Sequence, residues 1–216
     1  MSATSKAPGA HAALGELDFD IEALPDKEVV GKITHHRAIR FGLTAVKNRR
    51  AFDLALASEV ADARASARPL SLIMADLDRF KSVNDRYGHQ AGDEVIVSVV
   101  QRLREGLRAC DVVARWGGEE ITVLAPGIRD ADVLMRFGER IRTIVGAMPV
   151  ATRADVIPIS VSVGGTLLDG SASSQVALRT ADEALYDAKR TRDTTVVALP
   201  PRLSVHLEGH RRRRAS

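Results

Sequence analysis

Arg115-Trp116-Gly117-Gly118-Glu119-Glu120-Ile121 is the stretch of this sequence from which the fold can be worked out. It lies between two apolar runs, residues 112–114 and 121–124, that are suited to buried strands. Gly-Gly is a favoured two-residue hairpin turn because both positions can take positive φ. The stretch therefore predicts an antiparallel hairpin that turns at Gly117 and Gly118.

Two acids, Glu119 and Glu120, directly follow the glycines. Carboxylate oxygens are preferred ligands of Mg²⁺, and glycines let a ligand approach the backbone closely. A structural hairpin with solvated acids accounts for the same pattern. The choice between the two depends on whether a second carboxylate site converges on this turn.

Asp76 and Asp78 form a candidate second site, at the end of the apolar run 70–75. Residues two apart on a strand point to the same side, so these acids can place metal ligands at the rim of a sheet. Capping of the following helix is the alternative role for one of them. Lys81, close by, offers a point charge for a phosphate.

Asn84 and Asp93 lie on either side of Gly88-His89. An Asp carboxylate can accept both hydrogen bonds that guanine donates side by side, and Asn can meet the same base with one donor and one acceptor. The pair therefore suits guanine. Turn formation and helix capping remain open as structural explanations.

Hydrophobic periodicity places the hairpin within an alternation of strands and helices. Helices are predicted at 48–67, 92–107, 131–145 and 174–190, a turn or short helix at 79–87, and strands at 70–75, 156–164 and 194–199. The strand at 156–164 alternates as if one face were buried, with Pro158 at its start or on an edge. The pattern predicts an α+β fold in which helices cover one mixed sheet.

Length and composition fit one domain with extensions: 216 residues, 45% hydrophobic and 4% aromatic. Scarce aromatics argue against a base-stacking nucleic-acid surface, and the single cysteine, Cys110, excludes an internal disulfide. No run approaches the roughly 20 apolar residues of a membrane span and no signal peptide is recognisable, so a cytoplasmic location is expected. The four arginines at 211–214 are either a solvated tail or a site for nucleic acid or anionic lipid, and nucleic-acid binding has little else in its favour.

Together, these motifs resemble the GGDEF domain of diguanylate cyclases, here with the signature variant Gly-Gly-Glu-Glu-Ile. The resemblance covers about residues 40–198, in the right order, through the segments 43–44, 48–52, 76–93, 117–121, 160–164 and 181–189. It implies a five-stranded mixed or antiparallel sheet flanked by helices, similar to polymerase palm and nucleotidyl cyclase domains. The expected layout is an N-terminal extension (1–40), the GGDEF domain (41–199) and a basic tail (200–216).

The resemblance also implies an activity: two GTP molecules, one in each domain of a homodimer, are joined into cyclic di-GMP with release of pyrophosphate. Mg²⁺ (or Mn²⁺) would be held by Asp76, the Leu77 carbonyl, Glu119 and Glu120, and Glu119 would be the catalytic residue that helps to deprotonate the 3′-hydroxyl. The residues implied for GTP binding are Lys81, Asn84, His89, Asp93, Gly117, Gly118 and Lys189.

Arg108 and Asp111 match the family's inhibitory product site, an Arg-x-x-Asp motif separated from the two glycines by five residues. Arginine can contact a phosphate or the Hoogsteen edge of guanine with two hydrogen bonds. A surface ion pair is the alternative. We expect the pair to bind cyclic di-GMP as an inhibitor.

Several positions depart from the family pattern. Phe41 stands where an Asp is usual, Ala45 where a Gly is usual, and Arg192-Asp193 where the family has Gly-Arg. The change at Asp193 would remove or displace a phosphate contact, which keeps open a non-catalytic receptor for cyclic di-GMP or GTP. Residues 1–40 are short for a sensor domain and are expected to form a dimerising helix or to dock a regulatory partner.

Overall fold

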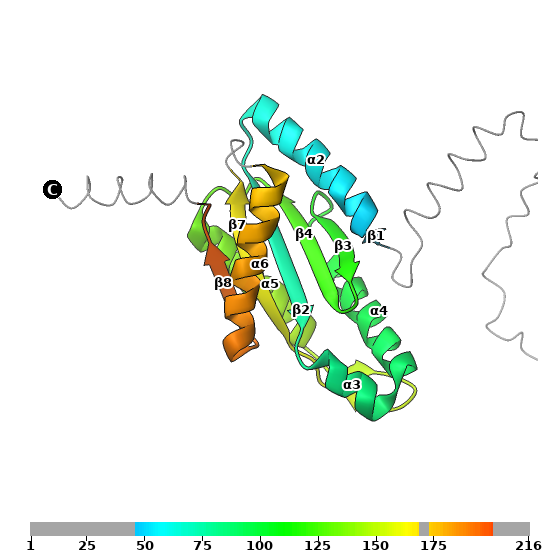
Figure 1. The fold of residues 1–216 in the computed structure, drawn as a ribbon. Coiled ribbons are helices and arrows are strands. Elements are labelled where there is room, and N and C mark those ends of the chain that lie inside the picture. Colours follow the sequence, from blue (N-terminus) through cyan, green and yellow to red (C-terminus); the bar gives the residue numbers. More distant parts are fainter. Residues whose placement is uncertain (1–45, 169–172, 201–216) are drawn as a thin grey trace, which may run out of the picture. The chain divides into compact units, whose positions relative to one another are not determined.

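A computed structural model describes residues 46–168 and 173–200 of the chain (Figure 1). These residues belong to the larger of two compact units, Arg37–Ser216, the other being Met1–His36. The predicted N-terminal extension at 1–40, the departures at Phe41 and Ala45, and the arginines at 211–214 lie outside the described residues. The domain boundaries at 40 and 199 therefore stay predictions.

Six strands form one mixed sheet in the order β1-β3-β4-β2-β7-β8. They are β1 (Lys47–Asn48), β2 (Leu70–Leu77), β3 (Val112–Gly117), β4 (Glu120–Pro126), β7 (Val161–Leu168) and β8 (Thr195–Ala198). Central β2 is antiparallel to its neighbours β4 and β7, while the outer pairs β1/β3 and β7/β8 are parallel. The expected five-stranded sheet is thus extended by the two-residue β1 beside β3.

Helices cover both faces of the sheet, which agrees with the predicted mixed sheet covered by helices. They are α2 (Arg49–Ser66), α3 (Phe80–Tyr87), α4 (His89–Gly106), α5 (Ala131–Gly146) and α6 (Ser174–Thr191). Helices α2 and α6 share a buried cluster with one face, and α4 and α5 share another with the opposite face (Figure 1). Three of the predicted helices (48–67, 131–145 and 174–190) are confirmed to within a residue at each end.

The central strand β2 shows how the two layers arise from alternation. Leu72 and Met74 pack in the cluster with α2 and α6, whereas Ile73 and Ala75 pack in the cluster with α4 and α5. All eight residues of β2 are buried. Continuing the alternation places Asp76 on the side of α6, at the strand's carboxyl end.

The predicted strand at 156–164 is wrong in two respects. The chain forms β6 (Val156–Ile157), which pairs with β5 (Val150–Ala151), and then a separate strand, β7. Pro158 has no N–H to donate, and it lies in the gap between the two strands. Strand β7 is also buried on both faces, not one, because α6 packs so closely that a Cβ on Gly164 would overlap the backbone of Leu185.

Helix α4 begins three residues before the predicted start at 92, at His89. The reason is Gly88, which ends α3 and opens α4 with a φ of 85°. A positive φ is accessible to glycine at little cost. The two helices are therefore joined by a single residue, which fixes Asn84 on α3 close to the start of α4.

Candidate active site

The hairpin that joins β3 and β4 is present, but its turn lies one residue later than predicted. Gly117 is still paired, with Glu120 as its partner, so the turn residues are Gly118 and Glu119. Among the glycines of the described residues, positive φ occurs at Gly88 and Gly127 and not at either hairpin glycine. A register shift at Trp116 absorbs one residue of β3, and Arg115 donates from Nε to the Gly118 carbonyl at 2.9 Å.

The register of β2 against β4 brings Asp76 to the acidic end of this hairpin. Asp76 lies opposite Glu120 on β4 and opposite Ser162 on β7. The backbone N–H of Leu77 donates to the Glu119 carbonyl at 3.4 Å. The two carboxylate segments, separate in the sequence, therefore converge at one end of the sheet.

Asp76 is a buried carboxylate with a cation beside it. Its side chain is 9% exposed, and Nζ of Lys189 on α6 lies 2.7 Å from its Oδ2. Burial raises the pKa of Asp76 above the ordinary 3.8, Lys189 opposes that rise, and the charges of Glu119 and Glu120 add to it. The acids are thus close enough to repel one another, which is the electrostatic setting that a divalent cation relieves.

The donor atoms at this end of the sheet suit a hard cation, because Asp76, Glu119 and Glu120 all offer carboxylate oxygens. Within residues 46–168 and 173–200, no three acidic, histidine or cysteine side chains already meet at one point. Lys189 also contacts one oxygen of Asp76. The residues fit a divalent metal in chemistry, and they would have to turn toward it.

Asp78 has a structural role that the sequence did not reveal. Its buried carboxylate accepts hydrogen bonds from Ser160 Oγ at 2.7 Å, from Ser162 Oγ at 2.6 Å and from the backbone N–H of Asp193 at 3.0 Å. The alternative that it caps the following helix is wrong, since the N-cap residue of α3 is Arg79 and no side chain caps that end. Asp78 instead ties β2, β7 and the α6–β8 turn together.

The candidate guanine-binding residues Asn84 and Asp93 lie on the paired helices α3 and α4. The Asn84 side chain lies over Gly92, where an added Cβ would overlap Oδ1 of Asn84. Gly92, directly before Asp93, was not predicted as a site residue. Because it has no Cβ, it leaves the space that the Asn84 side chain occupies. Asp93 and His89 are both exposed in the first turns of α4.

The remaining predicted contacts of GTP are distributed around this end of the sheet. Lys81 is exposed on α3, while Lys189 is on the last turn of α6 and is bound to Asp76. A Cβ on Gly118 would meet nothing within 4 Å, whereas one on Gly117 would lie 3.0 Å from Glu120 Oε2. The backbone at Gly118 is thus open to a ligand.

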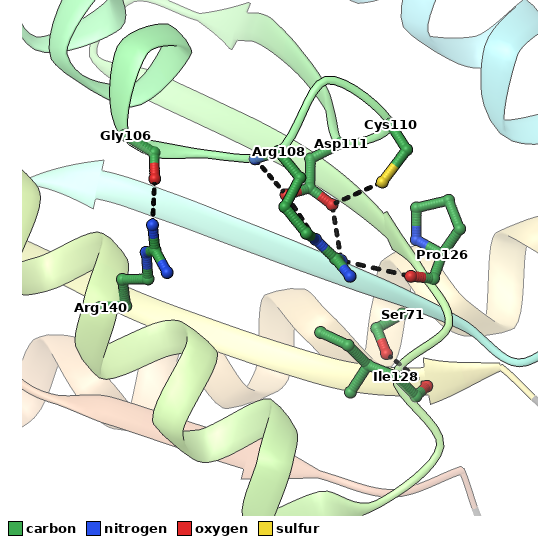
Figure 2. A network of polar contacts seen from close by, with 8 residues as sticks. All are labelled: Ser71, Gly106, Arg108, Cys110, Asp111, Pro126, Ile128 and Arg140. Atoms are coloured by element: carbon green, nitrogen blue, oxygen red, sulfur yellow. Dashed lines mark hydrogen bonds and ion pairs between the residues drawn. The ribbon is translucent and has the colours of Figure 1, made fainter.

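Arg108 and Asp111 form an ion pair between α4 and β3 (Figure 2). Arg108 donates from Nη2 to Asp111 Oδ1 at 2.7 Å and from Nε to Oδ2 at 3.2 Å, and also reaches the Pro126 carbonyl at 3.2 Å. The Asp111 carboxylate is fully buried, and its hydrogen bonds raise the pKa of Arg108. The pair borders a cleft of about 290 Å³ that α5 lines with Arg136 and Arg140.

Asp193, the departure from the family pattern, points its carboxylate at α5. Its Oδ1 lies 2.9 Å from Nη1 of Arg142, which also pairs with Glu139 at 2.9 Å. The hydrogen bonds that Arg142 donates to these two acids raise its pKa. The Asp193 side chain therefore links the α6–β8 turn to α5.

Comparison with known proteins agrees with the fold and with the motifs. Residues 40–195 match the family described as diguanylate cyclase, GGDEF domain. The diguanylate cyclase DgcP of Pseudomonas aeruginosa is 37% identical over 163 residues, which are 75% of this chain and 24% of DgcP. The response regulator PleD of Caulobacter vibrioides is 37% identical over 163 residues, 74% of this chain and 36% of PleD. The chain thus spans about a quarter to a third of these relatives.

Among solved structures, the coiled coil and GGDEF domain of DgcB from Caulobacter crescentus in complex with c-di-GMP aligns with a TM-score of 0.70. It is 31% identical, and the match covers 79% of this chain and 94% of that one. The diguanylate cyclase SiaD of Pseudomonas aeruginosa, in complex with its activator SiaC, aligns with a TM-score of 0.71 at 34% identity, covering 79% and 66% of the two chains. In the part of the chain that the structure describes, every helix is too short or too polar to span a bilayer. The fold, the hairpin and these matches together place the chain in the GGDEF domain family of diguanylate cyclases.

Proposed function

We propose that this chain is an active diguanylate cyclase that condenses two GTP molecules into cyclic di-GMP and releases pyrophosphate. The observation that carries the proposal is the β2–β4 register, which sets Asp76 beside Glu119 and Glu120. Asn84 and Asp93 lie on the helices that follow β2 directly. The proposed base site would therefore follow Asp76 of the proposed cation site along the chain.

Asp76, Glu119 and Glu120, with the Leu77 carbonyl, would hold Mg²⁺ or Mn²⁺. The bound cation would supply charge neutralisation at the α-phosphate and at the leaving pyrophosphate. The side chains of Glu119 and Glu120 would turn toward Asp76, and Lys189 would move from Asp76 to the phosphates. Burial raises the pKa of Asp76 and the charges of Glu119 and Glu120 add to that rise, which supports this exchange.

The guanine base would be read by Asn84 and Asp93, with His89 beside them. Asp93 can accept two hydrogen bonds from the guanine edge, and Asn84 can donate one and accept one. Gly92 holds the Asn84 amide against α4. Lys81 and Lys189 would contact the β- and γ-phosphates, and the backbone at Gly117 and Gly118 would lie along the ribose and α-phosphate.

Each domain would hold one GTP, so the reaction needs a homodimer that brings two 3′-hydroxyls opposite two α-phosphates. Glu119 would assist deprotonation of the attacking hydroxyl.

Cyclic di-GMP would then inhibit the enzyme by binding at Arg108 and Asp111. For this, the guanidinium group of Arg108 would have to hydrogen-bond to both Asp111 and the ligand. An inhibition curve left unchanged by Arg108→Ala would count against this feedback site.

A receptor without turnover is the second candidate, and the side chain of Asp193 favours it. The acid stands where the family has a phosphate-contacting Arg, and it is bound to Arg142. Incubation of the purified chain with GTP and Mg²⁺ separates the two, provided that bound nucleotide is first removed. Accumulating cyclic di-GMP supports the cyclase, whereas binding of GTP or cyclic di-GMP without product at dimerising concentrations supports the receptor.

A further inference from the structure

The β3–β4 hairpin contains the one tryptophan of the chain, Trp116, directly before the two glycines. Arg115 lies opposite Ile121. The next pair along the hairpin is Gly117 with Glu120, so β3 has one residue more than β4 at this point, and that residue is Trp116. A bulge of this kind bends a strand and re-aims its side chains, and bulges are over-represented beside active sites.

The ring of Trp116 is held by the first turn of α2. The guanidinium of Arg49 lies over it, with Cζ 4.4 Å from the ring centroid. Phe52 packs against the same ring edge to face, with the centroids 5.6 Å apart and the planes at 88°. Because Phe52 is fully buried, the indole has a fixed aromatic neighbour as well as a cation over its ring.

The backbone connects the same two elements. Asn48 of β1 lies opposite Arg115 of β3 in a parallel pair, and its side chain caps α2 by accepting from the Ala51 N–H at 3.0 Å. Arg115 in turn donates from Nε to the Gly118 carbonyl at 2.9 Å. Contacts therefore lead from the start of α2, through β3, to the turn that contains Glu119.

Trp116 lies on the face of the sheet that also carries the proposed metal site. Its ring packs against the buried cluster shared by α2 and α6, and Lys189 of α6 binds Asp76 at the end of β2. Glu119 follows Trp116 by three residues, and the two residues between them are glycines. Glycine backbone is conformationally permissive, so the orientation of this turn depends on the contacts that neighbouring residues make.

We infer that Arg49 and Trp116 are positioning residues for the metal site, an inference that rests on the metal site of the proposed function. Arg49 holds the indole in place, and the indole fixes the bulge directly before the turn. The two side chains act at a distance from the cation, by setting how often the Glu119 carboxylate faces Asp76. Loss of the contact lowers the fraction of molecules in that arrangement, and the apparent dissociation constant of the metal rises in proportion.

The binding of Mn²⁺ to the full chain without nucleotide tests the inference independently of turnover. Arg49→Gln removes the cation over the ring, and Arg50→Gln, the exposed neighbour on α2, is the matched control. Arg49→Gln should raise the Mn²⁺ dissociation constant about threefold to tenfold, the range that a partly exposed cation–π contact covers. Arg50→Gln should match wild type. Equal dissociation constants for the two variants overturn the inference.

A double-mutant cycle decides whether Arg49 acts through Trp116. Trp116→Leu keeps an apolar side chain against Phe52 but removes the aromatic face. In the Trp116→Leu background, Arg49→Gln should weaken Mn²⁺ binding no further. Additive losses would mean that Arg49 acts by another route, and they would overturn the inference.

The fluorescence of Trp116 gives a direct signature of the contact, because the chain has one tryptophan. Arg49→Gln should shift the emission to longer wavelength, since water reaches the ring that the guanidinium covered. Arg50→Gln should leave the emission as in wild type. An unchanged spectrum in Arg49→Gln would show that the guanidinium does not cover the ring, which removes the basis of the inference.

The rate of cyclic di-GMP formation is measured in parallel, so that this inference and the proposed function can fail separately. Arg49→Gln should need more Mg²⁺ for its half-maximal rate and should approach the wild-type rate when Mg²⁺ is saturating. Weakened Mn²⁺ binding in Arg49→Gln, in a protein that makes no cyclic di-GMP, would support the positioning role and refute the cyclase. Normal cyclic di-GMP formation with equal Mn²⁺ affinity in Arg49→Gln and Arg50→Gln would do the reverse.

Discussion

Lys189 and Asp76 form an ion pair between α6 and β2, with Nζ 2.7 Å from Oδ2. The Asp76 carboxylate is buried, and the charges of Glu119 and Glu120 lie near it. Lys189 is thus the cation that the fold itself supplies to this acidic end of the sheet. A metal ion bound by Asp76 has to compete with it.

Lys189→Met should therefore tighten the binding of Mn²⁺ in the absence of nucleotide. Removing the competing ammonium leaves Asp76 with only acidic neighbours, and we expect roughly a tenfold gain in affinity, since a charge-assisted hydrogen bond is worth about 1.5–3 kcal/mol. The electron paramagnetic resonance signal of free Mn²⁺ measures it. Lys81→Met, which removes an exposed lysine charge from α3, is the matched control. Equal Mn²⁺ affinity in wild type and Lys189→Met would show that the two cations do not compete.

The raised pKa of Asp76 gives a prediction for stability against pH. Its folded-state pKa lies above 3.8, the ordinary value, so the folded protein holds the Asp76 proton more tightly than the unfolded chain. The contribution to stability is full below the unfolded pKa and is lost as pH rises through the folded pKa. Asp76→Asn should therefore stabilise the protein at pH 8, by about 0.5–2 kcal/mol, or a few degrees in Tm.

Thermal unfolding at pH 8 and at pH 3 checks this sign. The gain from Asp76→Asn should shrink at the lower pH, where the wild-type carboxyl is protonated. A variant less stable than wild type at pH 8 would mean that the Lys189 pair outweighs the cost of burying Asp76.

Asp78→Ala should destabilise the fold rather than only alter catalysis. The substitution leaves two hydroxyls and one backbone N–H without their acceptor. We expect a loss of about 2–4 kcal/mol, because an unsatisfied buried polar group costs about 1–3 kcal/mol. Urea unfolding measures it, with the exposed α3 residue Asp85→Ala as the control. Similar urea midpoints for the two variants would show that the Asp78 carboxylate does not stabilise the fold.

Gly92→Ala should weaken GTP binding while the helix remains stable. The new methyl group would overlap Oδ1 of Asn84, so the amide must swing away from the base site. Alanine is the better helix former by about 1 kcal/mol, which limits any loss of stability. Calorimetry with a non-hydrolysable GTP analogue should show roughly tenfold weaker binding, the loss of about one good hydrogen bond.

Gly146→Ala serves as the control for this helix substitution, because its Cβ would meet only Ile159 O at an ordinary 3.8 Å. If Gly92→Ala binds the analogue as tightly as Gly146→Ala does, Asn84 does not contact the base.

The hydrophobic pattern was sufficient to predict the layers of the fold. The apolar run at 70–75 and the helical periodicity predicted a mixed sheet covered by helices, and the Gly-Gly pair predicted the hairpin, because each follows from local spacing. The turn position was missed since it depends on the irregularity at Trp116, which no composition rule marks. Pro158 was visible in the sequence, but it was interpreted as a strand start or an edge position and not as a separation of two strands.

The site was predictable where residues are close in sequence and not where they meet by long-range packing. Asp76 and the acidic hairpin were both recognised as carboxylate sites, while their exact pairing is set by the β2–β4 register. Asp78 and its serine partners lie far apart in the chain, so only the folded sheet shows that they bond. The pairing of Asp193 with Arg142 likewise depends on how α5 packs beside the α6–β8 turn.

The central claim is that Asp76 on β2 and Glu119 in the hairpin belong to one metal–GTP site, and the rate of cyclic di-GMP formation tests it most directly. Wild type, Asp76→Asn, Glu119→Gln and the remote control Glu105→Gln are assayed with GTP and Mg²⁺ after their folds are verified by circular dichroism. We predict that the first two variants lose at least about a hundredfold in rate, because metal charge stabilisation is worth several kcal/mol, and that Glu105→Gln matches wild type. Wild-type rates in Asp76→Asn or Glu119→Gln would contradict the account.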